Sequence, residues 1–131
     1  NYRCGTGHSV SFVGNVHEGP HALNGRNTTL MRPGMIVTDE PGVYETNLVG
    51  IRIENELVCV HKADNQYGTF LGFEPIMFVP IATSPIVPGV LTKDELDWLN
   101  NYHRQVFEKL APCLNDEERE WLAKKCAAIG C

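Results

Sequence analysis

The sequence predicts an α+β fold in which antiparallel strands come first and two helices come last. Up to about residue 75, apolar and polar residues alternate with a period of two, which is typical of half-buried strands. A proline-containing stretch over residues 80–88 then leaves little room for regular structure. From residue 92 onward the apolar residues recur every three or four positions, as on one face of a helix. Strands followed by helices indicate an α+β arrangement.

Residues 50–60 form the strand with the clearest alternation. One side of this strand carries Arg52, Glu54 and Glu56, and the opposite side is apolar around Ile51 and Ile53. A surface strand with mixed charges would show the same pattern, so the strand alone does not identify a site. Further strands are expected at 11–16, 35–38, 43–45 and 69–73, the last returning antiparallel after a polar connection over 61–68.

Both helices are expected to begin with a capping box. In this motif the N-cap side chain accepts the backbone N–H of a glutamate three residues later, and the side chain of that glutamate accepts the backbone N–H of the N-cap residue. The first helix covers 92–110 and opens with Thr92 and Glu95, and the second opens with Asn115 and Glu118 and runs to about 127.

Each helix has apolar residues that we expect to be buried. In the second helix these are Trp121 and Leu122. His103, in the first helix, has polar neighbours and is expected at the surface. The buried stripe of the first helix is expected to comprise Leu96, Leu99, Tyr102, Val106 and Leu110.

Length and charge limit the possible functions. A chain of 131 residues has the length of one domain. The net charge of -5 and the scattered basic residues argue against a nucleic-acid partner. The sequence contains neither an apolar run of about 20 residues nor the apolar core of a signal peptide. We therefore expect no membrane association, and we expect a cytoplasmic protein.

The cysteines indicate a reducing compartment, and the first residues indicate a longer protein. Five cysteines are widely spaced without a Cys-x-x-Cys pair, which favours free thiols in a reducing compartment over a zinc cluster or a disulfide framework. The chain starts without methionine, inside a glycine-rich segment. We therefore expect it to be part of a longer protein.

Four residues of metal-binding type occur at turns and strand ends. His8 follows two glycines, His17 precedes a Glu-Gly-Pro turn, and Glu40 precedes Pro41-Gly42. With Glu54, this set allows one imidazole and two carboxylates to converge on a divalent metal. The same residues also have ordinary interpretations: His8 in a glycine turn, His17 capping a turn, and Glu40 as a solvated turn residue.

Four motifs occur in order along the chain: Gly-Thr-Gly-His at 5–8, Val-His-Glu-Gly-Pro at 16–20, Asp-Glu-Pro-Gly at 39–42 and Gly-Ile-Arg-Ile-Glu-Asn at 50–55. Taken together, these motifs resemble the Xaa-Pro aminopeptidase (aminopeptidase P) family of pita-bread metallopeptidases. The likeness continues into Phe-Glu-Pro at 73–75, Val-Pro at 79–80 and the Asp97–His103 stretch, and this last stretch disfavours prolidase, creatinase and methionine aminopeptidase.

The resemblance implies a fold and a metal centre. The chain would be the C-terminal half of a pita-bread catalytic domain, with residues 1–91 forming the half domain and 92–131 its helical tail. His8 would be the imidazole ligand, Glu40 a carboxylate ligand, and Glu54 the carboxylate that bridges two divalent ions, usually manganese in this family.

The resemblance also implies a reaction and its substrates. His17 would contact the substrate and help to move protons, while Arg52 and Tyr44 would line and support the site. The expected activity is hydrolysis of the bond before proline at the second position of a peptide, by a homodimer. The alternative is a pita-bread module that lost the chemistry and binds peptides or proteins.

The sequence departs from the family pattern at two places. The family uses two further aspartate ligands from a strand pair before the glycine-histidine motif, and these lie outside this chain, so we expect the chain alone to be inactive. In addition, Cys4 stands where the family usually has a histidine, and Ser9-Val10-Ser11 replaces Gly-Val-Gly. Loss of that histidine would remove a substrate contact.

Overall fold

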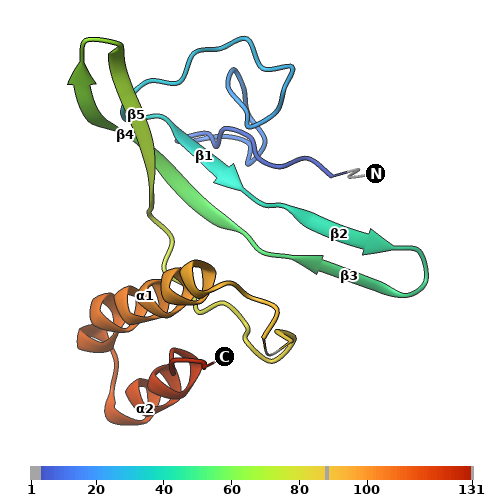
Figure 1. Cartoon of the computed structure of the whole chain (residues 1–131), viewed down its shortest axis with the longest axis vertical. Coiled ribbons are helices and arrows are strands. Elements are labelled where there is room, and N and C mark those ends of the chain that lie inside the picture. Colours follow the sequence, from blue (N-terminus) through green and yellow to red (C-terminus); the bar gives the residue numbers. More distant parts are fainter. Residues whose placement is uncertain (1–3, 88, 131) are drawn as a thin grey trace. The chain divides into compact units, whose positions relative to one another are not determined.

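The computed structural model describes residues 4–87 and 89–130. Two compact units divide the chain, one up to Met77 and one from Phe78 onward. The first contains strands β1 to β5, and the second contains helices α1 and α2 with a short 3-10 turn between them (Figure 1). The predicted order of antiparallel strands followed by two helices is confirmed. The division into a half domain and a helical tail at residue 91 stays a prediction.

A three-stranded antiparallel sheet with the order β1-β4-β5 forms the centre of the first unit. It consists of β1 (Ile36–Asp39), β4 (Asn55–Asn65) and β5 (Gly68–Pro75). The β4–β5 hairpin is the longest pairing, and its strands extend through most of the region predicted as a polar connection over 61–68. The returning antiparallel strand predicted at 69–73 is confirmed.

A second, two-stranded sheet is the hairpin of β2 (Gly42–Glu45) and β3 (Val49–Arg52). Asn47 in its turn has a φ of 59°, a left-handed conformation that asparagine adopts more readily than most residues. The N–H of Leu48 donates to the carbonyl of Glu45 at 3.0 Å and closes the turn.

The single strand predicted at 50–60 is wrong, because the structure divides it between β3 and β4 at Ile53 and Glu54. The interruption faces Pro41 on the opposite side of the ladder. The N–H of Ile53 donates to the carbonyl of Pro41 at 3.3 Å, but proline has no N–H to donate in return. The two sheets therefore meet at an interruption that carries Glu40 on one side and Glu54 on the other.

The strand predicted at 11–16 is also wrong, since this stretch is irregular. Phe12 and Val13 are exposed, so the apolar residues that suggested a strand do not form a buried face. Among the described residues near this stretch, regular pairing is limited to isolated bridges of His8 with Ala22 and of Ser9 with Val37.

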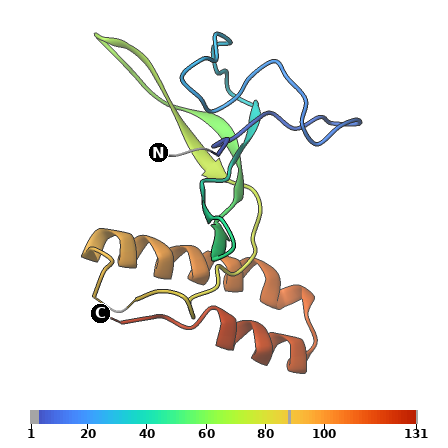
Figure 2. The same ribbon diagram turned by 90° about the vertical axis from the view of Figure 1, so that its right-hand side faces the viewer.

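Helices α1 (Lys93–Leu110) and α2 (Asp116–Lys125) follow each other through a 3-10 turn at Ala111–Cys113. Both predicted capping boxes are present, with Thr92 and Asn115 as the N-cap residues. The two helices lie side by side in both views (Figure 2).

The core of the second unit joins both helices through Tyr102, Val106 and Leu122. His103 is fully buried, so its predicted surface position is wrong. Its Nε2 accepts the backbone N–H of Ile81 at 3.1 Å, because the segment before α1 covers this face of the helix. The predicted burial of Trp121 is also wrong: its exposed fraction is 57%.

None of the helices in the described ranges is long and apolar enough to span a membrane. The described cysteines, Cys4, Cys59, Cys113 and Cys126, are free thiols, as predicted for them. Cys131 lies outside the described residues.

Candidate metal centre

The glycine-rich segment before His8 runs along β1 and is held there by backbone hydrogen bonds. The N–H of Glu40 donates to the carbonyl of Thr6 at 2.6 Å, and the N–H of Thr38 donates to the carbonyl of His8 at 2.9 Å. The N–H of His8 in turn donates to the hydroxyl of Thr38 at 3.0 Å. A Cβ on Gly7 would lie 1.8 Å from the carbonyl oxygen of Thr38, so only glycine permits this approach.

The ring of His8 lies between two oxygen atoms. Nδ1 is 2.9 Å from the carbonyl of Ser9, and Nε2 is 3.0 Å from Oε1 of Glu40. Because a carbonyl only accepts, Nδ1 carries the proton and Nε2 presents its lone pair to a carboxylate. Two acceptors at this separation require a second proton or a metal ion on Nε2. This geometry is suited to a cation between His8 and Glu40.

The carboxylate of Glu40 is oriented by its neighbours. Thr38 donates to Oε1 at 3.0 Å, and Nη1 of Arg52 lies 2.5 Å from Oε2. Nη1 of Arg52 also donates to the backbone carbonyl of Glu40 at 2.6 Å. Glu40 is therefore fixed through both oxygen atoms and the backbone.

Arg52 is itself oriented by Tyr44, whose hydroxyl accepts from Nε at 2.8 Å. The hydrogen bond to Tyr44 is the largest cause that raises the pKa of Arg52 above its ordinary value, and the negative charge of Glu40 adds to it. Arg52 stays cationic, and Tyr44 and Arg52 support a predicted ligand.

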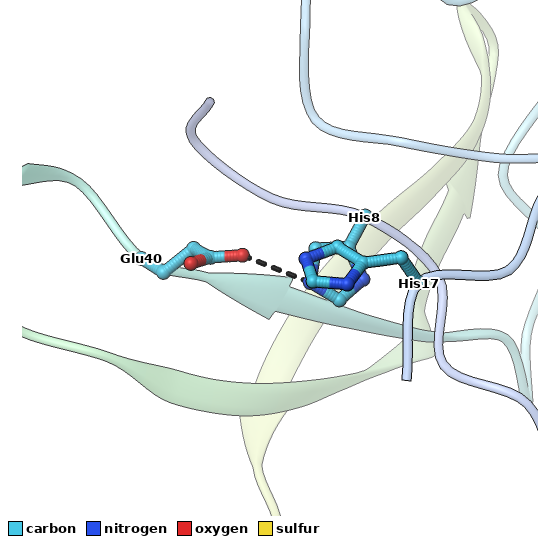
Figure 3. A group of neighbouring side chains, drawn as sticks. All are labelled: His8, His17 and Glu40. Atoms are coloured by element: carbon cyan, nitrogen blue, oxygen red, sulfur yellow. Dashed lines mark ion pairs between the residues drawn. The ribbon is translucent and has the colours of Figure 1, made fainter. Parts of the chain in front are cut away.

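His17 lies beside His8, with ring centroids 4.1 Å apart and ring planes tilted by 39°. One ligand atom each from His8, His17 and Glu40 lies within 4.8 Å of the others (Figure 3). His8 and Glu40 are half-buried, whereas His17 is exposed. The sequence predicted His17 near the site but did not indicate its distance from His8, because it follows an irregular loop that residue spacing does not describe.

Glu54 is not a member of this three-residue group. Its backbone nevertheless lies across from Glu40. Asp39 pairs with Asn55 in one ladder and Gly42 pairs with Arg52 in the other, so the register is the same on both sides of the interruption. Continuing this register across the interruption pairs Glu40 with Glu54.

A cleft of about 610 Å³ lies beside the glycine-rich segment. Its lining joins Cys4 and Gly5 to residues 20–28 of the following loop, including Pro20 and Asn24. Cys4, at the position where the resembled family usually has histidine, therefore faces open space next to the residues that hold His8.

Two family models match the chain. The model of metallopeptidase family M24 matches residues 1–61, and the model of the C-terminal region of peptidase M24 matches residues 69–129. All six candidate site residues fall within the first match, and both helices fall within the second.

Proteins with similar sequences are named as aminopeptidases P. Aminopeptidase P2 of Arabidopsis thaliana is 47% identical over 128 residues, which are 92% of this chain and 18% of that protein. Probable Xaa-Pro aminopeptidase P of Coprinopsis cinerea is 42% identical over 136 residues, which are 98% of this chain and 22% of that protein. The chain thus spans about a fifth of the length of these relatives.

A solved structure has the same fold. It is described as X-prolyl aminopeptidase from Caenorhabditis elegans, a cytosolic enzyme with a di-nuclear active site. It is 37% identical with a TM-score of 0.83, over 95% of this chain and 21% of that chain. The chain therefore has the fold of the corresponding part of that structure.

Proposed function

Since the chain belongs to metallopeptidase family M24, in its aminopeptidase P group, we propose that it forms part of the catalytic domain of a dinuclear aminopeptidase. The proposed reaction releases an N-terminal residue that precedes proline. The observation that carries the proposal is the contact between Nε2 of His8 and Oε1 of Glu40 at 3.0 Å, within the segment that matches the family.

The residues present fit divalent metal ions. Nδ1 of His8 is fixed by a backbone carbonyl, which leaves Nε2 for a metal. Glu40 is fixed by Thr38 and Arg52, and Glu54 lies across from it in register. We propose that His8 and Glu40 are ligands and that Glu54 is the bridging carboxylate. We also propose manganese as the ion, by resemblance to the family.

His8, Glu40 and Glu54 would hold the divalent ions, which would supply a hydroxide at neutral pH and would stabilise negative charge on the carbonyl oxygen of the substrate. Other residues of the chain orient the proposed ligands. Arg52 neutralises Oε2 of Glu40, and Tyr44 fixes Arg52, so we propose that both support the site and line it for substrate.

We propose that His17 contacts the peptide and moves a proton during hydrolysis. Its exposed ring lies beside His8, where it can reach a bound peptide without being displaced from a buried position. General acid–base groups contribute about 10²- to 10⁴-fold to rate, so His17→Ala should lower turnover by that factor.

A second candidate function is an inactive module that binds peptides. Cys4 favours it, because the histidine usual at this position contacts substrate in the resembled family. A preserved His8–Glu40 contact favours the enzyme.

We further propose a cytoplasmic homodimer that acts on peptides. The C. elegans relative is described as cytosolic. The β2–β3 hairpin exposes Val43, Leu48, Val49 and Ile51, apolar side chains of the kind that a partner covers.

The experiment that tests the proposal replaces the matching part of the C. elegans enzyme with residues 4–130 of this chain. Hydrolysis of a peptide with proline at position two is expected from the chimera, and Glu54→Ala should abolish it. Glu56→Ala is the matched control. A folded chimera that binds this peptide without cleaving it would contradict the enzyme and support the binding module.

A further inference from the structure

Ser9 is buried, and its backbone joins three segments of the first unit. Its N–H donates to the carbonyl of His21 at 3.0 Å. Its carbonyl accepts from the N–H of Glu18 at 3.2 Å and from Nδ1 of His8 at 2.9 Å. Glu18 follows His17 directly in the chain. One carbonyl therefore helps to fix the positions of both histidines of the three-residue group (Figure 3).

The ring of His21 reaches from its own segment to strand β1. Nε2 of His21 lies 2.7 Å from the carbonyl oxygen of Ile36. Because a carbonyl only accepts, Nε2 carries the proton and Nδ1 presents its lone pair. Nδ1 is buried and, among the described residues, has no hydrogen-bond partner. A buried acceptor without a partner destabilises the fold, because it has lost its hydrogen bonds to water.

The hydroxyl of Ser9 is the complementary group. It too is buried and lacks a hydrogen-bond partner within the described ranges. The bridge of His8 with Ala22 places Ser9 opposite His21 in the same short ladder. Residues that lie opposite each other in an antiparallel ladder have side chains on the same face. A hydroxyl can donate a hydrogen bond and a bare ring nitrogen can accept one, so two buried groups of matching capacity share this face.

We propose that Ser9 and His21 form a positioning pair, in which the hydroxyl of Ser9 donates to Nδ1 of His21. The pair ties Ser9 through the His21 ring to the carbonyl of Ile36, and so fixes the carbonyl that orients His8. The resembled family usually has glycine at position 9, which has no hydroxyl, so the pair is not part of the resemblance. The inference rests on the proposed function, since it assigns these two residues a role in positioning His8 and His17 for that reaction.

Amide hydrogen exchange at Ser9 tests the pair in the chimera with the C. elegans enzyme. Ser9→Ala removes the hydroxyl, and His21→Gln removes Nδ1 while keeping an N–H for Ile36. Each should speed exchange by about 10-fold, because each leaves a buried partner unpaired. The double variant should exchange no faster than either single variant, since both remove the same bond. Ser11→Ala is the matched control, because the hydroxyl of this half-buried serine lies against Gly14 instead.

Effects that multiply in the double variant would overturn the pair, as would a Ser9→Ala variant that exchanges like Ser11→Ala. Nitrogen spectra of the histidine-labelled chimera, loaded with diamagnetic zinc, give a second test that needs no folded Ser9 variant. The signal that His21→Gln removes belongs to His21. Nδ1 should have the shift of an acceptor in a hydrogen bond, and Ser9→Ala should move it to that of a free acceptor. A free acceptor in the unaltered chimera would also overturn the pair.

Turnover tests the positioning role. Ser9→Ala should lower kcat by about 10-fold with two metal ions still bound, because the ligand is misoriented but not lost. If kcat per metal-loaded chain matches Ser11→Ala, the positioning role fails and the proposed function stands. If the unaltered chimera cleaves no peptide, the proposed function fails, and the exchange and nitrogen spectra still decide whether Ser9 and His21 are paired.

Discussion

Gly7→Ala should detach the segment that carries His8 from strand β1. The added Cβ would lie 1.8 Å from the backbone carbonyl oxygen of Thr38 and 3.2 Å from Cβ of Leu23. Ordinary contacts begin near 3.4 Å, so the two backbones must separate by more than an ångström. Overpacking of this kind costs about 1–3 kcal/mol.

The separation also breaks hydrogen bonds between the segment and β1. The Thr38–His8 and Glu40–Thr6 backbone bonds and the His8–Thr38 side-chain bond are at risk. Each contributes about 0.5–1.5 kcal/mol. Breaking these hydrogen bonds also relieves the overlap, so the two costs are not fully additive. We expect the free energy of opening this segment to fall by about 3 kcal/mol in total.

Amide hydrogen exchange of peptides covering residues 4–10 and 36–41 measures this effect locally. Tryptophan fluorescence would miss it, because Trp98 and Trp121 lie in the second unit. A loss of about 3 kcal/mol corresponds to about 100-fold faster exchange at Thr38 and Glu40.

Gly5→Ala is the control for this experiment, since a Cβ there meets nothing within 4 Å. It should leave exchange within a few-fold of the unaltered chain. Equal exchange in Gly7→Ala and the unaltered chain would refute the close approach of the two segments.

Three further predictions concern the second unit and the chain as a whole. Burial lowers the pKa of His103 below its ordinary 6.5. The unfolded chain therefore binds more protons, and the free energy of unfolding should fall as the pH drops from 7 through the folded pKa. Tryptophan fluorescence in urea should show this decline, and His103→Gln, which keeps an acceptor, should reduce it. Asn100→Ala removes two hydrogen bonds of 3.0 Å to the backbone of Ile129 and should lower the unfolding free energy of the second unit by about 1–3 kcal/mol. Asn101→Ala, at an exposed position, is the control and should change it little in the same assay. The 131-residue chain with added manganese should not cleave a peptide with proline at position two, because the two aspartate ligands of the resembled family lie outside it. It should also self-associate in analytical ultracentrifugation. Cleavage above a metal-free blank would show that those two ligands are not needed.

Local signals predicted the helices well. Each capping box is complete within four residues, so Thr92 and Asn115 indicated the helix starts without knowledge of the rest of the fold. His103 and Trp121 were placed wrongly because burial on a helix depends on what covers it. The segment beginning at Phe78 covers His103, and no local pattern within the helix indicates that contact.

The candidate site was partly predictable for the same reason. Turn residues around His8 and Glu40 indicated side chains held at fixed positions, and the structure brings these two together. The interruption between β3 and β4 was missed, because it depends on Pro41 in the opposing chain segment rather than on residues 50–60 themselves. The contacts of Arg52 with Glu40 and Tyr44 likewise depend on the hairpin formed by β2 and β3.

We propose that Glu40 and Glu54, whose backbones lie across from each other at the strand interruption, hold the same pair of metal ions. Counting metal ions per chain by mass spectrometry in the chimera with the C. elegans enzyme tests it most directly. Two ions are expected in the unaltered chimera and in Glu56→Ala. Fewer than two are expected in Glu54→Ala, because two cations without their shared anion repel each other. Two tightly bound ions in Glu54→Ala would contradict the claim.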